Sequence, residues 1–498
     1  MICNWQEGIT EHAPNDLSMK LGHNLKWTSL AQISKLCAQF VVVFMLARLL
    51  EPGEYGVVAM ATVVVNFSLM FRDMGLGAAI IQKQDLGRGD IDAAFRVSLV
   101  AGSLVCLLVL LAAVPLAMYF SAPGLAPLLA VLSLSFPIAG CGIVHQALLE
   151  RAGHFRTIAR IEGSSNLVGG ALGLVSALAG AGAWSLVVQL AFVSIATSVQ
   201  LWLASEWRPT ASRGLVGYRG LAEFGSGVLG FNLVNYLSRN LDSILVGRFY
   251  SSTVLGNYSL AYRLMLFPLQ SITLVVSRSL LPVLSRLQSD RRGRVEVYQI
   301  AVGGITLVVA PMMVGLYVLR EPFIRLAFGE GWNLAVQLLA WFAPTALLQS
   351  VMSVTGVVLM AARRTRTLLH LGVIGAMLQV GAFALGITHG VVVMAALYLL
   401  ANLLNFIPVM LVCARVLGAR PSEVTQPMIP PLIAALIMGG TLELYKRYGD
   451  FAQDAVSLTL AIMASAAWYV VLALAFSREW RRRALSALSV FRRATKAA

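Results

Sequence analysis

Long apolar runs alternate with short polar segments along almost the entire chain. A helix that crosses a bilayer needs about 20 mostly apolar residues. Fourteen runs of this kind are bounded by charge clusters, glycine or proline: 27–47, 57–71, 97–119, 126–149, 157–179, 183–204, 222–246, 255–281, 298–319, 334–361, 368–388, 390–413, 428–445 and 455–476. The pattern predicts an all-α polytopic membrane protein with about 14 transmembrane helices. The second run is short and is expected to extend beyond Arg72, and only a Thr-His-Gly segment separates the eleventh and twelfth runs.

The charges between these runs are distributed unequally. If the N-terminus lies in the cytoplasm, the cytoplasmic segments hold 28 Lys and Arg residues and the opposite side holds six. Cytoplasmic loops of membrane proteins are enriched in these residues, so the bias predicts that both termini are cytoplasmic. The longest outward segment, between the ninth and tenth runs, has about 14 residues, which is too short for a folded domain of about 50 residues. Any function must therefore reside in the helices and their connections.

Composition narrows the class of protein. Apolar residues make up 58% of the 498 positions, charged residues 12%, and the mean hydropathy is +0.78. Soluble domains carry about 25% charged residues, so a soluble enzyme is excluded. The net charge of +15 is explained by cytoplasmic loops, and no nucleic-acid partner is expected.

The sequence lacks the motifs of cofactor chemistry. The cysteines form no CxxC pair and no cluster with histidine, and the Walker A, HExxH and GxSxG patterns are absent. We therefore expect no catalytic residues, no metal site, no ATP site and no other cofactor. No motif names a coupling ion.

An internal repeat relates the two halves of the chain. The segment ARLLEPGEYG begins at residue 47 and GRFYSSTVLG at residue 247, so that Arg48 and Gly56 match Arg248 and Gly256 at an offset of 200. At the same offset, polar stripes on the preceding runs match: Gln32 with Asn232, Lys35 with Asn235 and Gln39 with Arg239. Each stripe has the spacing of one helical face. A second resemblance pairs Pro137 in the fourth predicted span with Pro344 in the tenth, each of which follows an apolar run inside its span.

The spacing implies a repeat of six spans. Because six is even, both copies cross the membrane in the same direction and are related by an axis along the membrane normal. The predicted organisation is a cytoplasmic segment 1–26, an N-lobe 27–204, a linker 205–221, a C-lobe 222–413, an appended pair of spans 414–476 and a basic cytoplasmic tail 477–498.

Polar side chains inside the spans suggest a central cavity, because charges in a bilayer usually face an interior cavity or a partner. Guanidinium groups suit phosphate oxygens, and amides and tyrosines suit sugar hydroxyls. The candidate cavity residues are Gln32, Lys35, Gln39, Asn232, Asn235, Arg239, Asp242, Tyr262, Arg263 and Gln270. Together they favour an anionic, polyhydroxylated substrate.

Several of these charges have a simpler structural interpretation. Arg239 and Asp242 are three residues apart and could pair with each other, and Glu162 could balance the cations. Arg278 lies near the end of its span and could reach the interface. Glu443 is near the outer end of the thirteenth span and is expected either to be structural or to lie beyond the true end of that span.

An ordered set of motifs resembles a known family. ARLLEPGEYGVVAMA, DMGLGAAIIQKQDL, LLERAGHFRTIARIE, LDSILVGRFYSSTVLGNYSLAYRL, LLPVLSRLQSD and AFGEGW are similar to the polysaccharide transporter branch of the multidrug/oligosaccharidyl-lipid/polysaccharide exporter superfamily. The resemblance runs from about residue 22 to residue 418. It implies two helical lobes around a central cavity that opens alternately to each side of a bacterial inner membrane.

The resemblance also implies a function. Family members are flippases that move undecaprenyl-diphosphate-linked oligosaccharide repeat units to the periplasmic leaflet, where a polymerase joins them into O-antigen, capsule or exopolysaccharide. The implied partners are this lipid-linked substrate, membrane lipids and, as a further candidate, the polymerase. One alternative is a cation-coupled exporter of small amphipathic molecules, which would favour an acidic cavity. Another is a membrane polymerase or glycosyltransferase, which would need a long or carboxylate-rich outward loop.

Overall fold

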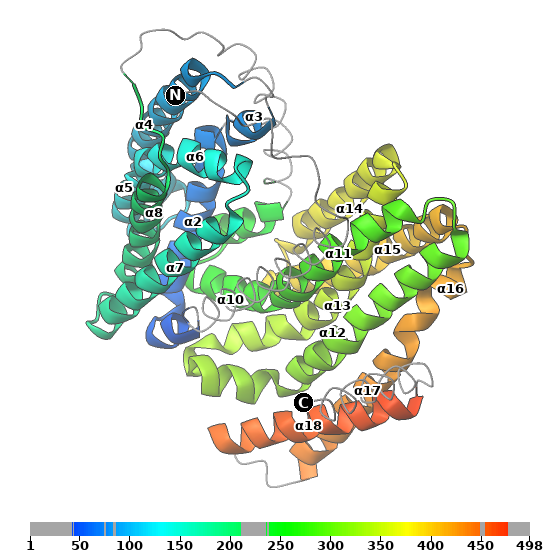
Figure 1. Ribbon diagram of the computed structural model, residues 1–498. Coiled ribbons are helices and arrows are strands. Elements are labelled where there is room, and N and C mark those ends of the chain that lie inside the picture. The colour runs from blue at the N-terminus through cyan, green and yellow to red at the C-terminus, as the bar shows by residue number, and fades with distance from the viewer. Residues whose placement is uncertain are drawn as a thin grey trace, which may run out of the picture. The chain divides into compact units, whose positions relative to one another are not determined.

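The computed structural model describes residues 44–73, 76–82, 86–210, 239–448 and 454–476, together with Val42 and Tyr236. Every regular element in these ranges is a helix (Figure 1). Eleven helical segments there are long and apolar enough to span a membrane. The predicted all-helical polytopic class is therefore confirmed. Of the three remaining predicted spans, 27–47 and 222–246 lie largely outside the described residues, and 157–179 forms α7 (Phe155–Leu178), which is not counted among the eleven.

The helices group into two compact units, which do not divide the chain at a single point. Unit 1 contains residues 64–115 and 126–233, and unit 2 contains residues 47–63, 116–125 and 234–498. Unit 1 thus holds the C-terminal part of α2 (Pro52–Asp73) and most of α4 (Arg88–Tyr119), with α3 (Leu76–Gln82), α5 (Leu125–Ser133), α6 (Ser135–Arg151), α7 and α8 (Trp184–Ala204). The rest of each helix, residues 52–63 of α2 and 116–119 of α4, belongs to unit 2.

Unit 2 holds most of the remaining elements. They are α10 (Ser252–Pro268), η1 (Leu269–Thr273), α11 (Leu274–Arg286), α12 (Arg291–Phe328), η2 (Glu330–Trp332), α13 (Asn333–Ala361), α14 (Thr365–Gly386), α15 (Val391–Leu417), α16 (Pro421–Thr425), η3 (Gln426–Met428), α17 (Ile429–Tyr448) and α18 (Ala455–Phe476). Residues 239–249 are also helical. The core of this unit is α12, α13 and α15, and α17 packs along α12.

Local sequence explains several helix ends. The side chain of Ser251 caps α10 by accepting a hydrogen bond from the Val254 amide, and Asp290 caps α12 by accepting one from Gly293. Gly418 adopts φ +70° where α15 ends. The break predicted from the Thr-His-Gly segment is confirmed, because α14 ends at Gly386 and Gly390, with φ +109°, precedes α15.

The structure corrects other boundaries. The ninth span, predicted as 298–319, is the 38-residue α12, so the predicted outward segment of about 14 residues shrinks to four, Gly329–Trp332. Pro137 lies in the first turn of α6 and Pro344 lies inside α13, so both prolines lie within the spans 126–149 and 334–361, as predicted. Proline is tolerated in membrane helices when neighbouring groups satisfy the freed carbonyl. The apolar pattern alone therefore placed both ends of the ninth span incorrectly.

Candidate functional site

The two repeat corners meet in unit 2. A Cβ atom added to Gly56 on α2 would overlap the carbonyl oxygen of Ser252, and one added to Gly256 on α10 would overlap the carbonyl oxygen of Pro52. The two overlaps are related by the offset of 200 that the sequence shows. Only glycine permits this approach, since any side chain would push the two backbones apart.

Each of the two corner arginines contacts a helix end from the other half of the repeat. Arg48 donates a hydrogen bond to the Leu326 carbonyl near the C-terminus of α12. The guanidinium of Arg248 lies 4.9 Å from the ring centroid of Tyr119, the last residue of α4. Leu326 and Tyr119 are 207 positions apart, the same offset that relates Pro137 to Pro344. Each corner cation therefore lies at the C-terminal, electronegative end of the third helix of the other copy.

A third motif packs against the first corner. The ring of Trp332, from AFGEGW, lies edge-on to Tyr55 with centroids 5.6 Å apart, and a Cβ on Gly331 would lie 3.3 Å from Pro52. The Arg263 guanidinium lies 5.5 Å from the centroid of Tyr55. We call this region, residues 48–56, 119–120, 248–256 and 326–332, the corner crossing. It brings together three motifs that are far apart in the sequence.

A polar and aromatic cluster lies deeper in the same unit. Asp242 is 1% exposed, and its carboxylate accepts hydrogen bonds from the Tyr258 hydroxyl at 2.8 Å and the Ser243 amide at 2.7 Å. Tyr258 stacks on Tyr262, and both contact Phe342 edge-on. The cluster thus connects α10 with α13.

The cluster continues through α13 to α15. Gln349 donates to the hydroxyl of Tyr398 at 2.7 Å and to Oδ1 of Asn402 at 3.1 Å. Because each of these buried polar groups has a partner, the network is a fixed structural element of the unit.

Five of the ten predicted cavity residues, Gln32, Lys35, Gln39, Asn232 and Asn235, lie outside the described residues. Of the others, Arg239, Arg263 and Gln270 are exposed, Tyr262 is half-buried and Asp242 is buried. The structure places all five of these in unit 2, on the helical residues 239–249, on α10 and on η1.

The alternative pairing of Arg239 with Asp242 is not found in the described part of the chain. Asp242 instead binds Tyr258, and Arg239 is exposed and lies close enough to Tyr262 to interact electrostatically. Sequence spacing suggested the pair because the two residues lie one helical turn apart. It could not show that a tyrosine from another helix donates a hydrogen bond to the carboxylate of Asp242.

The other charged candidates have separate outcomes. Glu443 pairs with Lys446 at 3.7 Å and with Arg447 at 3.0 Å on α17, in keeping with the structural interpretation. Glu162 is half-buried on α7 in unit 1. The side chain of Arg278 lies outside the described residues.

Sequence reasoning missed the aromatic Phe342 and four cluster members with polar groups: Tyr258, Gln349, Tyr398 and Asn402. Gln349 and Asn402 are polar residues inside apolar runs, so the rule used for the opening spans would have found them if it had been applied to every span. The two tyrosines gave no comparable signal, because tyrosine is common at membrane interfaces.

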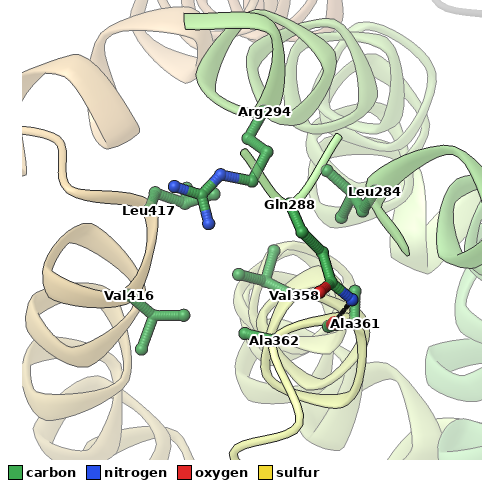
Figure 2. Close-up of a pocket in the computed structure, with 8 residues that line it drawn as sticks. All are labelled: Leu284, Gln288, Arg294, Val358, Ala361, Ala362, Val416 and Leu417. Atoms are coloured by element: carbon green, nitrogen blue, oxygen red, sulfur yellow. Dashed lines mark hydrogen bonds between the residues drawn. The ribbon is translucent and has the colours of Figure 1, made fainter. Parts of the chain in front are cut away.

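The described residues contain no group of three His, Cys, Asp or Glu side chains that could hold a metal. A small pocket at the ends of α11, α12, α13 and α15 is mostly apolar, with Gln288 and Arg294 at its edge (Figure 2). Gln288 donates to the Ala361 carbonyl at 3.3 Å. The pocket adjoins the electronegative C-terminal ends of α13 and α15 and contains none of the predicted cavity residues. It is therefore not the candidate site.

Comparison with known proteins adds independent findings. Residues 45–337, more than half of the chain, match a family described as polysaccharide biosynthesis protein. The chain is 29% identical over 470 residues to the succinoglycan biosynthesis transport protein ExoT of Rhizobium meliloti, covering 93% of this chain and 94% of that protein. It is 27% identical over 418 residues to the teichuronic acid biosynthesis protein TuaB of Bacillus subtilis, covering 83% and 86%.

A solved structure shares the fold. The lipid II flippase MurJ, in an inward closed conformation, superimposes with a TM-score of 0.73 over 91% of this chain and 99% of that chain. The two sequences are 13% identical, so the likeness concerns the fold alone.

Proposed function

The chain belongs to the polysaccharide biosynthesis protein family, within the multidrug/oligosaccharidyl-lipid/polysaccharide exporter superfamily, and from this premise we propose that it flips undecaprenyl-diphosphate-linked oligosaccharide repeat units across a bacterial inner membrane. The resemblance seen in its motifs is confirmed, as is a role in membrane transport for polysaccharide biosynthesis. The observation that carries the proposal is the match to a named polysaccharide transport protein along 93% of the chain.

The exposed cations support an anionic substrate. Arg239 and Arg263 are both exposed in unit 2, and no carboxylate pairs with either of them among the described residues. A guanidinium without a carboxylate partner is unfavourable in lipid, so it is expected to face a water-filled cavity. There it can bind two phosphate oxygens at once. Tyr262 and Gln270, about two helical turns apart, offer partners for sugar hydroxyls.

The corner crossing supports alternating access. We assign the crossing to the periplasmic side, with both termini cytoplasmic, because the loop charges place Arg48 and Arg248 on the outward side. Two six-helix lobes related by a parallel repeat would then meet at this end. In this proposal the crossing is the contact that closes the outward side, and it separates when the substrate is released.

The alternatives receive less support. An exporter of cationic amphipathic molecules would favour an exposed carboxylate, whereas Asp242 is buried and bonded to Tyr258. A polymerase or glycosyltransferase would need a substantial outward loop, whereas residues 329–332 are all that separates α12 from α13.

A clean deletion of the gene tests the proposed function. The mutant should accumulate a complete repeat unit on its lipid carrier and make no polymer, because the flippase acts after assembly and before polymerisation. Mass spectrometry of extracted lipid-linked intermediates, with the wild-type gene on a plasmid as the control, measures this. Incomplete repeat units would instead indicate a glycosyltransferase.

Replacing Arg239 with alanine should lower polymer output while leaving the amount of protein in the membrane near normal. A charge-assisted hydrogen bond contributes about 1.5–3 kcal/mol, so loss of one contact should weaken substrate binding by about one to two decades. Arg239→Lys should restore output only in part, because an ammonium group cannot form the bidentate contact. Quantitative immunoblotting beside a polymer assay measures both quantities.

The matched control replaces Asp242. Because Asp242 bonds to Tyr258, Asp242→Ala should disturb the buried cluster and should not rescue Arg239→Ala. Recovery of transport in the double variant Arg239→Ala/Asp242→Ala would reject Arg239 as a substrate contact.

A further inference from the structure

The helix α12 contains two prolines, and each leaves a backbone carbonyl without its partner. Proline has no N–H group, so the carbonyl four residues earlier loses its helical hydrogen bond. Pro311 frees the carbonyl of Leu307, and Pro322 frees that of Val318. In an apolar environment, an unsatisfied carbonyl is unfavourable.

Both freed carbonyls accept a hydrogen bond from the appended pair of helices. The hydroxyl of Tyr469, on α18, donates to Leu307 at 2.9 Å. The ammonium of Lys446, on α17, donates to Val318 at 3.4 Å. Tyr469 is 5% exposed, so its hydroxyl is directed into the protein and not to lipid headgroups.

This match is specific to α12. Prolines also interrupt α4, α10, α11, α13 and α15, yet only in α12 does a side chain bond to the freed carbonyl in the part of the chain that the structure describes. Pro115 in α4 corresponds to Pro322 at an offset of 207, but α4 has no second proline that corresponds to Pro311.

Close packing fixes the appended pair in position. Ala434, Ala435 and Met438 on α17 form a buried cluster with Ala310 on α12 and Tyr469 on α18. A Cβ on Gly439 would lie only 2.5 Å from Val314 Cγ1. Small residues permit this approach of helices, and Figure 1 shows α17 and α18 beside α12.

The outer end of the same helix enters the corner crossing, where its Leu326 carbonyl binds Arg48 and the turn that follows carries Trp332 against Tyr55. We propose that Tyr469 and Lys446 are positioning residues: they hold α12 at the two carbonyls that its prolines free, so that its C-terminal end is kept where the crossing can close. The proposal concerns the geometry of α12 itself. Only its consequence for transport rests on the proposed function.

A cross-linking rate tests it without any transport measurement. Gly331→Cys and Pro52→Cys, in the full chain with the native cysteines replaced, report how often the end of α12 meets α2, since a Cβ on Gly331 lies 3.3 Å from the Pro52 ring. Tyr469→Phe should slow disulfide formation in membranes by about three- to tenfold, the range expected for loss of one hydrogen bond. Tyr448→Phe is the matched control, because Tyr448 is 85% exposed on α17.

The proline itself supplies the decisive comparison. Pro311→Ala restores an N–H group that can bond to Leu307, so Tyr469→Phe should then have no effect on the rate. Lys446→Met and Pro322→Ala, made singly and together, form a second, independent double-mutant cycle. An unchanged rate in Tyr469→Phe, or an equal decrease with and without Pro311, would overturn the proposal. A normal cross-linking result together with a failed deletion test would reject only the flippase function.

Discussion

Gly56→Ala and Gly256→Ala are each expected to reduce polymer output to below about one-tenth of the wild-type level. Alanine normally stabilises a helix relative to glycine by about 0.5–1 kcal/mol, so helix propensity alone predicts a harmless change. Here the added methyl group would overlap a backbone carbonyl of the opposite corner. Overpacking of this kind costs about 1–3 kcal/mol, and under the proposed alternating access only the state with the crossing closed bears that cost. Complementation of a deletion strain, with polymer normalised to membrane protein, measures the effect.

The matched control is Gly304→Ala. Gly304 is a glycine in α12, and a Cβ there meets nothing within 4 Å. It should therefore support normal transport. The two corner variants should have similar effects, and the double variant should be little worse than either, because both separate the same pair of backbones. Normal transport by Gly256→Ala would show that the crossing does not need to close.

The sequence predicts much of the fold because the bilayer restricts the choice. Only helices satisfy their backbone within lipid, so apolar runs locate the spans, and the last one, 455–476, coincides with α18. The offset between the two corner motifs predicted equivalent positions, and Gly56 and Gly256 do form related contacts. The sequence could not show that the equivalent corners contact each other, because a repeat offset along the chain carries no information about distance in space.

The interior of the site was harder to predict for a physical reason. A charge in a membrane helix must be satisfied, but spacing shows only partners on the same helix. Asp242 is satisfied by Tyr258, sixteen residues away on α10, and the α12 carbonyls are satisfied by residues more than a hundred positions away. Such partners depend on tertiary packing. The sequence points to such a partner only where a proline within a helix frees a backbone carbonyl that needs a hydrogen-bond donor.

A disulfide across the corner crossing is expected to stop transport reversibly. A Cβ added to Gly53 would lie 3.3 Å from Oγ1 of Thr253. Cysteines at these two positions would therefore have their side chains in contact, as a disulfide requires. In a chain whose five native cysteines are replaced, Gly53→Cys with Thr253→Cys should link α2 to α10. If the crossing must open to release substrate, polymer output should fall nearly to that of the deletion strain. A reductant should restore it.

The same pair also tests which side of the membrane the crossing faces. Disulfides form in the oxidising periplasm and are rare in the reducing cytoplasm, so a periplasmic crossing should link without added oxidant. Each single-cysteine variant is the control for damage by substitution or oxidation. A link that forms only after a membrane-permeable oxidant is added would place the crossing in the cytoplasm and reverse the topology derived from the loop charges. Undiminished transport by fully linked protein would show that substrate leaves without separation of α2 from α10, and alternating access at the corner crossing would then be wrong.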